Sequence, residues 1–177
     1  TSAYVMSLNN EIFFSPATFT NTNLDPTRRI GFEIGATYRI SDPVLLKGSL
    51  TYINATFRSG QFEGNQIPLV SPWTGNVGIS WNVFQKYIML DADLRYIGSR
   101  RFDNDAANFQ PLMPAVTLVD LKVSGQIERF SWALTVQNLL NKENYFDYGI
   151  ASTATYGTYN AYTMPGRNFT GKIGIKF

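Results

Sequence analysis

Residues 130–145 read FSWALTVQNLLNKENY. In the first part of this stretch, apolar Trp132, Leu134 and Val136 alternate with polar Ser131, Thr135 and Gln137. A period of two is typical of a β-strand with one apolar and one polar face. The stretch therefore predicts a strand over 130–140, and the same pattern recurs through most of the chain.

Alternation predicts nine strands in all. They are expected at 2–9, 11–20, 28–40, 44–57, 73–84, 86–100, 115–127, 130–140 and 167–177. Most are longer than the roughly 5–6 residues usual in soluble domains, and long enough for a tilted strand to cross a bilayer. The charged side chains of these strands fall on the polar parity: Arg29, Glu33, Arg39, Lys47, Asp91, Asp93, Arg95, Asp120, Lys122, Lys172 and Lys176.

The connections between these strands alternate between short and long. The short ones are 9–10, 41–43, 85 and 129, and the long ones are 21–27, 58–72, 101–114 and 141–166. Outer-membrane barrels have short periplasmic turns and long extracellular loops. The pattern therefore favours an all-β, antiparallel, up-and-down transmembrane β-barrel. A soluble β-sandwich or lipocalin-like barrel, with the apolar face as its core, is the alternative.

The composition excludes several classes of function. Charged residues are 16% of the 177 and aromatic residues 15%, so disorder is disfavoured. The chain has no Cys and no His, which removes disulfides, Cys or His metal sites and His-dependent nucleophilic catalysis. No basic cluster suits nucleic acid. We therefore expect no enzyme activity, no cofactor or metal, and no nucleic-acid partner.

The end of the opening stretch carries a family resemblance. Residues 136–145, VQNLLNKENY, resemble the penultimate strand of TonB-dependent outer-membrane receptors, which ends in a V-x-N-L-F/L-D/N-K-x-Y pattern. The family's last strand follows a P-G-R-like turn, as at 165–167, and finishes on an aromatic residue, as at Phe177. Leu140 departs from the pattern, since Phe is commoner there.

Weaker resemblances lie upstream. Residues 28–33, RRIGFE, resemble the family's R-x-G-x-E strand, and Asp42-Pro43 resembles a periplasmic turn of the family. The resemblance implies a 22-stranded barrel plugged by an N-terminal domain. It also implies a receptor for iron–siderophore complexes, cobalamin, haem or another scarce nutrient, with an iron–siderophore complex as the expected cargo.

By this resemblance, residues 1–177 form one segment of about nine C-terminal barrel strands, without the plug or the earlier strands. The implied location is the outer membrane of a Gram-negative bacterium. The implied partners are its lipid and lipopolysaccharide, a siderophore or similar small ligand, the barrel-assembly machinery, and the TonB complex through the missing N-terminal region. Phe177 is expected on the periplasmic side, and nine strands then place Thr1 on the extracellular side.

Two other architectures remain open. One is a complete eight-stranded outer-membrane barrel that acts as an anchor or adhesin, with 1–9 as a leader. The other is a soluble β-sandwich binding module. An odd number of strands suits a C-terminal piece better, because a complete bacterial barrel has an even number.

Candidate ligand-binding residues lie in the expected extracellular loops. Aromatic side chains combine a large contact area with a polar tip, and Arg can hold an anionic chelate. The candidates are Tyr145, Tyr148, Tyr156, Tyr159, Tyr162, Arg58 and Arg101. Alternatively, the tyrosines pack against each other or against lipopolysaccharide, and the arginines are solvated charges. Ile173, Ile175 and Phe177 resemble the C-terminal signal read by the barrel-assembly machinery.

Overall fold

The computed structural model describes residues 1–15, 18–85 and 87–177. Within these ranges no helix is long and apolar enough to cross a membrane. Eight antiparallel strands form one sheet, here called the wall, in the order β1-β4-β5-β6-β7-β8-β9-β12. Their bounds are Ser2–Leu8, Thr27–Ser41, Val44–Phe57, Trp73–Phe84, Ile88–Ile97, Val116–Ile127, Phe130–Gln137 and Asn168–Ile175.

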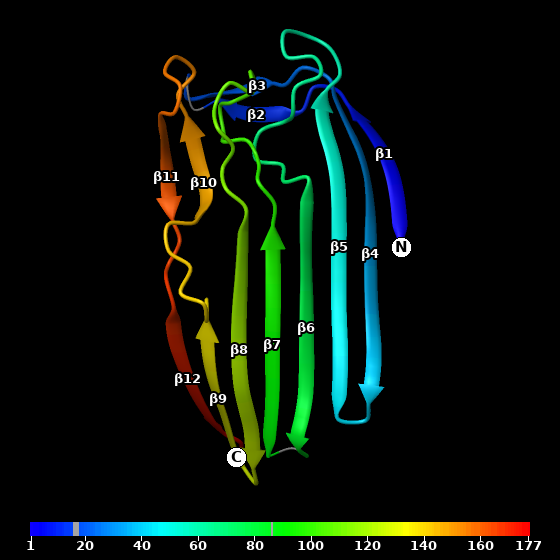
Figure 1. The fold of residues 1–177 in the computed structure, drawn as a ribbon, viewed down its shortest axis with the longest axis vertical. Helices are drawn as coiled ribbons and strands as arrows, with labels where there is room; N and C mark the ends of the chain where they lie inside the picture. Colours follow the sequence, from blue (N-terminus) through cyan, green and yellow to red (C-terminus); the bar gives the residue numbers. More distant parts are fainter. Residues whose placement is uncertain (16–17, 86) are drawn as a thin grey trace.

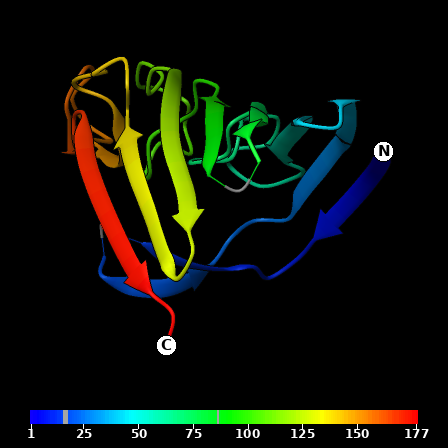
Figure 2. The same ribbon diagram turned by 90° about the horizontal axis from the view of Figure 1, so that it is seen from below.

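Two hairpins lie outside the wall. They are β2 (Ile12–Ser15) with β3 (Thr20–Asn23), and β10 (Phe146–Ala151) with β11 (Tyr159–Thr163). Figure 1 shows the long wall strands side by side, with both hairpins at one end of the sheet. Figure 2 shows the wall as an open arc, with the β2–β3 hairpin on the open side. The expected all-β, antiparallel, up-and-down architecture is confirmed.

The predicted strand over 11–20 is wrong. Residues 16–17 of this stretch lie outside the described residues; before them lies β2, the stretch ends on the first residue of β3, and Ile12 pairs with Asn23. Apolar residues are consecutive at 12–14, and β3 reads TNTN, so this stretch lacks the alternation of apolar and polar residues that marks the wall strands. The wall consequently has eight strands rather than about nine.

This difference also corrects the predicted position of the first residue. β1 pairs directly with β4, from Ser2 opposite Glu33 to Leu8 opposite Thr27. The chain therefore begins beside the middle of β4 and runs toward the end that carries the long loops, so Thr1 does not lie at that end.

The strand register gives the wall one continuous apolar face. Residues directly opposite in an antiparallel pair share a face, and one line of such partners crosses seven strands. The line contains Tyr38, Leu46, Ile79, Ala92, Leu121, Val136 and Phe169. Large apolar side chains on this face are exposed, Phe169 by 67%. Among the described residues no second sheet packs on it, so a β-sandwich is not supported.

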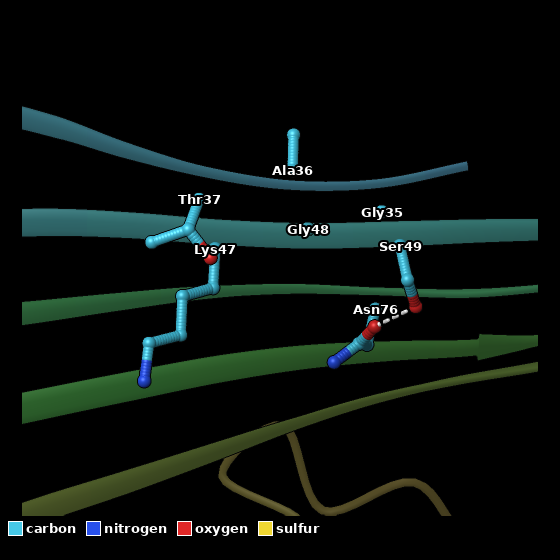
Figure 3. A pocket seen from close by; sticks show the side chains of 7 residues that line it. All are labelled: Gly35, Ala36, Thr37, Lys47, Gly48, Ser49 and Asn76. Atoms are coloured by element: carbon cyan, nitrogen blue, oxygen red, sulfur yellow. Dashed lines mark hydrogen bonds between the residues drawn. The ribbon is translucent and has the colours of Figure 1, made fainter. Parts of the chain in front are cut away.

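The opposite face of the wall is polar. Figure 3 shows Thr37, Lys47, Ser49 and Asn76 on this face and Ala36 on the other. The Ser49 hydroxyl hydrogen-bonds to the Oδ1 atom of Asn76 across β5 and β6. These polar residues border a shallow hollow of about 300 Å³ over glycines of β4 and β5. A membrane barrel has this polarity, with water or protein inside and lipid outside.

Aromatic rings mark both ends of the apolar face. Phe32, Tyr52 and Trp73 form a cluster near the long loops, with the Tyr52 and Trp73 ring centroids 4.6 Å apart. Trp81 lies toward the other end of β6. The two tryptophans are separated by about 26 Å along the strand at about 3.3 Å per residue. At the strand tilt of about 35–45° in such barrels this length corresponds to roughly 20 Å along the membrane normal, close to the apolar band about 25 Å tall between two aromatic girdles.

Candidate functional site

The four long connections, 9–26, 58–72, 98–115 and 138–167, gather at one end of the wall, here called the loop end. The three short turns lie at the other end (Figure 1). Both buried apolar clusters belong to the loop end. They consist of Ala55, Phe57 and Ile67, and of Phe102, Met113 and Ala151. The loop end is therefore the part of the described chain with a packed interior.

Arg100 ties loop 98–115 to the β10–β11 hairpin. Its side chain is buried, and its Nη2 atom donates to the carbonyl oxygens of Phe146 at 3.2 Å and Asp147 at 2.7 Å. Burial lowers the pKa of the guanidinium, and the charge of Asp147 acts in the opposite direction. Carbonyl oxygens take the place of water around this cation. Arg100 therefore holds loop 98–115 against the β10–β11 hairpin.

Asp103 makes a second tie to the same hairpin. Its amide donates to the carbonyl of Gly149 at 2.8 Å, and its carbonyl accepts from the amide of Ala151 at 2.9 Å. Its carboxylate accepts the hydroxyl of Tyr148. Burial, followed by this hydrogen bond and the charge of Asp103, raises the pKa of Tyr148 to about 12. Tyr148 therefore remains a neutral donor at physiological pH.

Gln110 makes the third tie. Its side chain is 2% exposed. The Nε2 atom donates to the carbonyls of Ser152 at 2.6 Å and Thr155 at 2.8 Å, and Oε1 accepts from the amide of Gly157 at 2.7 Å. One buried amide therefore fixes the turn between β10 and β11.

Loop 58–72 is bound to loop 98–115 through amide side chains. The amide group of Asn65 donates to the carbonyl of Ala106 at 2.9 Å. The side-chain amide of Asn108 accepts a hydrogen bond from the backbone amide of Gln66 and donates one to the Gln66 carbonyl, both at 2.9 Å. These contacts join residues about forty positions apart and hold the two loops together.

Glu11 anchors the base of the β2–β3 hairpin to β4. Its carboxylate accepts from the Thr27 hydroxyl at 2.5 Å and from Arg29 at 2.8 Å, and its carbonyl accepts the amide of Leu24. Burial acts to raise the pKa of Glu11, but the two side-chain hydrogen bonds and the charge of Arg29 outweigh it, so the pKa is lowered. Glu11 is thus ionised where it holds the hairpin.

A cavity of about 500 Å³ lies under the β2–β3 hairpin. Its walls come from the hairpin, from the end of β5 with loop 58–72, and from loop 98–115. Phenylalanine rings, a few polar groups and two carboxylates line it. Its volume is within the range of about 300–1,000 Å³ typical of small-molecule sites.

The predicted tyrosines are distributed over the β10–β11 region. Tyr148 and Tyr162 lie ring to ring at 5.9 Å, whereas Tyr159 stacks on Phe102 at 4.4 Å. The hydroxyl of Tyr145 donates to the carbonyl of Pro165. Packing within the loops therefore engages Tyr145, Tyr148 and Tyr159.

Two of the predicted tyrosines remain mostly exposed to solvent. Tyr156 and Tyr162 are 65% and 67% exposed. The ring of Tyr156 contacts Phe109 edge to face at 5.5 Å, and Phe109 lines the cavity. Tyr156 is thus linked to the cavity through one aromatic contact.

The two predicted arginines already have protein partners. Arg58 donates to Oδ1 of Asn9 at 2.8 Å. Arg101 donates to the carbonyls of Asn108 and Gln110, and its Nη1 atom lies 3.7 Å from Asp105. Arg58 therefore joins loop 58–72 to the connection 9–26, and Arg101, whose Nε atom also donates to Oε1 of Gln66 at 3.3 Å, joins loop 98–115 to loop 58–72.

The predicted assembly-signal residues lie at the end of the last strand and just beyond it. Ile173 and Ile175 belong to β12, Phe177 follows it, and all three side chains are exposed, Ile173 by 85%. They lie at the turn end, far from the loop end (Figure 1).

Sequence reasoning did not identify Asp103, Gln110 or the cavity. Each depends on partners far along the chain, and no local motif identifies such partners. Among the described residues, no group of three or more Asp, Glu, Cys or His side chains could hold a metal ion.

Comparison with known proteins places this fold. The family profile described as TonB dependent receptor-like, beta-barrel matches residues 1–139. The iron-regulated outer membrane virulence protein of Vibrio cholerae serotype O1 is 27% identical over 130 residues, which cover 72% of this chain and 20% of the relative. The chain thus spans about a fifth of that protein.

Solved structures share the architecture. The ferric yersiniabactin uptake receptor FyuA of Yersinia pestis matches with a TM-score of 0.78 at 18% identity, over 97% of this chain and 26% of that chain. The copper transporter OprC matches with a TM-score of 0.74 at 19% identity, over 99% and 28%. At such identities the likeness concerns the fold alone. The apolar wall, the segregated loops and the family match agree, and the chain belongs to the TonB-dependent receptor β-barrel family, whose members are outer-membrane transporters of Gram-negative bacteria and not enzymes.

Proposed function

We propose that this chain forms part of the wall and extracellular mouth of a receptor that imports an iron–siderophore complex. The observation that carries the proposal is the division of the molecule into two parts. An exposed apolar face covers the wall, and the packed interior is confined to the loop end. An interior at the loops suits capture of a small ligand from outside the cell. The iron-regulated relative and the ferric yersiniabactin receptor support iron as the cargo.

The uptake test uses the complete gene product in its own bacterium. Deletion of the gene should abolish growth on at least one ferric chelate as the sole iron source, and expression in trans should restore it. Unchanged growth on every ferric chelate tested would contradict the proposal.

Within the loop end, Tyr156 and Tyr162 are the proposed ligand contacts, since they keep most of their surface exposed. Tyr156→Ala and Tyr162→Ala should each weaken chelate binding several-fold. Tyr38→Ala, on the apolar wall face, is the matched control and should bind as the parent does. Equal binding by all three variants would count against these contacts. Arg58 and Arg101 remain proposed contacts of second rank, because protein groups already occupy them.

The partners follow from the same proposal. The apolar face would contact outer-membrane lipid, the loop end lipopolysaccharide and ligand, and TonB would drive transport by the complete receptor. Ile173, Ile175 and Phe177 are proposed as a signal for the barrel-assembly machinery. Phe177→Ala should lower the amount of folded receptor in the membrane, measured by heat-modifiable mobility, while Lys176→Ala should not. Equal amounts for both variants would remove the signal role.

A further inference from the structure

One side of the cavity is the face of the β2–β3 hairpin on which every second side chain lies. Phe13 pairs with Thr22 across the hairpin, so both side chains lie on the same face, and both line the cavity. Ile12 and Phe14, on the opposite parity, are exposed. The hairpin thus presents Phe13 to the cavity and forms its cover.

The charged groups that line the cavity have one sign. Among the described lining residues, Asp25 and Asp105 are charged and no Lys or Arg occurs. The Asp105 side chain is 2% exposed. Its Oδ1 atom accepts the amides of Phe109 at 2.7 Å and Gln110 at 3.2 Å. Its Oδ2 atom is buried and accepts no hydrogen bond from the described residues.

Arg101 only partly compensates this charge. Its Nη1 atom lies 3.7 Å from Oδ2 of Asp105, beyond hydrogen-bonding distance, and donates to two backbone carbonyls of the same loop. Asp25 is exposed. Two carboxylates in the lining, with no lining Lys or Arg among the described residues, give the cavity a negative potential, which favours a ligand that brings a positive charge.

The aromatic lining favours the same ligand. Four phenylalanines line the cavity: Phe13, Phe57, Phe62 and Phe109. Ring faces attract cations, most strongly where water is excluded, and they bury apolar chain equally well. The carboxylates and the aromatic rings therefore both favour a ligand with an apolar chain that ends in a positive charge.

We propose that this cavity receives an apolar arm of the cargo that ends in an ammonium group, held by the negative potential of Asp105 and the exposed Asp25. The inference rests on the proposed function and narrows it to chelates that carry an amine. For this cavity it replaces the expectation of an anionic chelate held by arginine, because carboxylates and, among the described residues, no Arg line the space.

The test compares two ferric trihydroxamates that differ only in this group. Ferrioxamine B carries a free ammonium, and its N-acetylated form is neutral. The complete receptor, purified in detergent, should bind ferrioxamine B about tenfold more tightly, as expected for an ammonium between a carboxylate and aromatic faces. A strongly anionic ferric tricatecholate should bind more weakly than either.

Variants separate the cavity from the rest of the mouth. Asp105→Asn keeps Oδ1 as an acceptor for both backbone amides and removes the charge, so the preference for the ammonium form should fall to about threefold or less. Asp25→Asn should act in the same direction. Glu63→Gln, in loop 58–72 but not among the lining residues, should keep the full preference. Ala107→Trp, which fills the cavity from an exposed position, should weaken binding of both hydroxamates.

The outcomes separate the inference from the proposed function. Equal affinity for the two hydroxamates, tightest binding of the tricatecholate, or an unchanged preference in Asp105→Asn would overturn the inference and leave uptake standing. No affinity for ferric chelates of any charge would overturn the proposed function itself.

Discussion

Three buried polar side chains, Arg100, Asp103 and Gln110, organise the loop end. Arg100 and Gln110 bond to backbone groups of the β10–β11 region, and Asp103 bonds to it through its own backbone and through the Tyr148 hydroxyl. A backbone group that has lost water needs a partner, and leaving one unpaired costs about 1–3 kcal/mol. The loops are therefore fixed by polar contacts as much as by the apolar clusters.

Replacing Gln110 by Ala should loosen the turn between β10 and β11. The substitution leaves the carbonyls of Ser152 and Thr155 and the amide of Gly157 without their partner. Amide hydrogen exchange across 152–157 should accelerate by about tenfold or more, as a loss of about 1–3 kcal/mol implies. The exposed Gln61→Ala is the control, and equal protection in both variants would refute this role.

Glu11 gives the hairpin a pH dependence. A carboxyl whose folded pKa is lowered adds stability above its unfolded pKa of about 4.3, and this stability disappears as pH falls through the folded pKa. The lowered pKa of Glu11 therefore predicts that 12–23 becomes sensitive to protease in acid below about pH 4. Glu11→Gln should show the same sensitivity already at neutral pH. If protection of 12–23 does not depend on pH or on this substitution, Glu11 is not the anchor.

Local pattern could not predict these residues. Gln110 contacts groups 42–47 positions away, and an amide in a loop carries no periodic signal. The sequence identified the aromatic content of 145–162 correctly as a feature of the loops, but not that Tyr148 bonds Asp103. Which residues contact ligand remains a prediction.

At the scale of elements, alternation predicted the long strands well. β4 to β6 and β8 lie close to the expected ranges. In these strands most of the residues at alternate positions are apolar, and only one orientation of the strand places all of these side chains on the lipid face. The stretch 11–20 failed because an apolar run at 12–14 carries no alternation and satisfies a hairpin equally well. β10 and β11 were missed because their residues pack within a loop cluster and not against lipid.

Neighbouring residues on β5 test the polarity of the wall. Leu50 lies on the apolar face and is 40% exposed, and Ser49 lies on the polar face beside the hollow. Leu50→Arg should destabilise the complete receptor by about 1–3 kcal/mol, because Leu50 lies between the midplane, where Arg on a lipid face costs about 2–4 kcal/mol, and the girdle at Tyr52, where the cost falls to about 0–1 kcal/mol. Ser49→Arg should cost far less. Urea unfolding in lipid vesicles measures both, and equal losses would contradict the assigned faces.

At the scale of the whole molecule, the wall is an open sheet with β1 and β12 at its edges. Among the described residues these two strands do not pair, so a closed eight-stranded barrel is not supported. Backbone groups in hydrocarbon must be hydrogen-bonded. We therefore expect both edges to pair with further strands in the membrane. The alternation of loop lengths predicted the division between loop end and turn end, and the wall confirms it.

Single cysteines in the complete receptor test the orientation most directly. The 177 residues contain no Cys, so each introduced thiol is unique within this chain, and the complete receptor without an introduced cysteine is the labelling control. A membrane-impermeant maleimide should label Tyr156→Cys at the loop end in intact cells. It should reach Asp42→Cys, in the turn between β4 and β5, only after the outer membrane is permeabilised, and Ile79→Cys should react only with a lipid-soluble reagent. Labelling of Asp42→Cys in intact cells, or of Ile79→Cys by the impermeant reagent, would contradict the assignment of this chain to a barrel wall with its loops outside the cell.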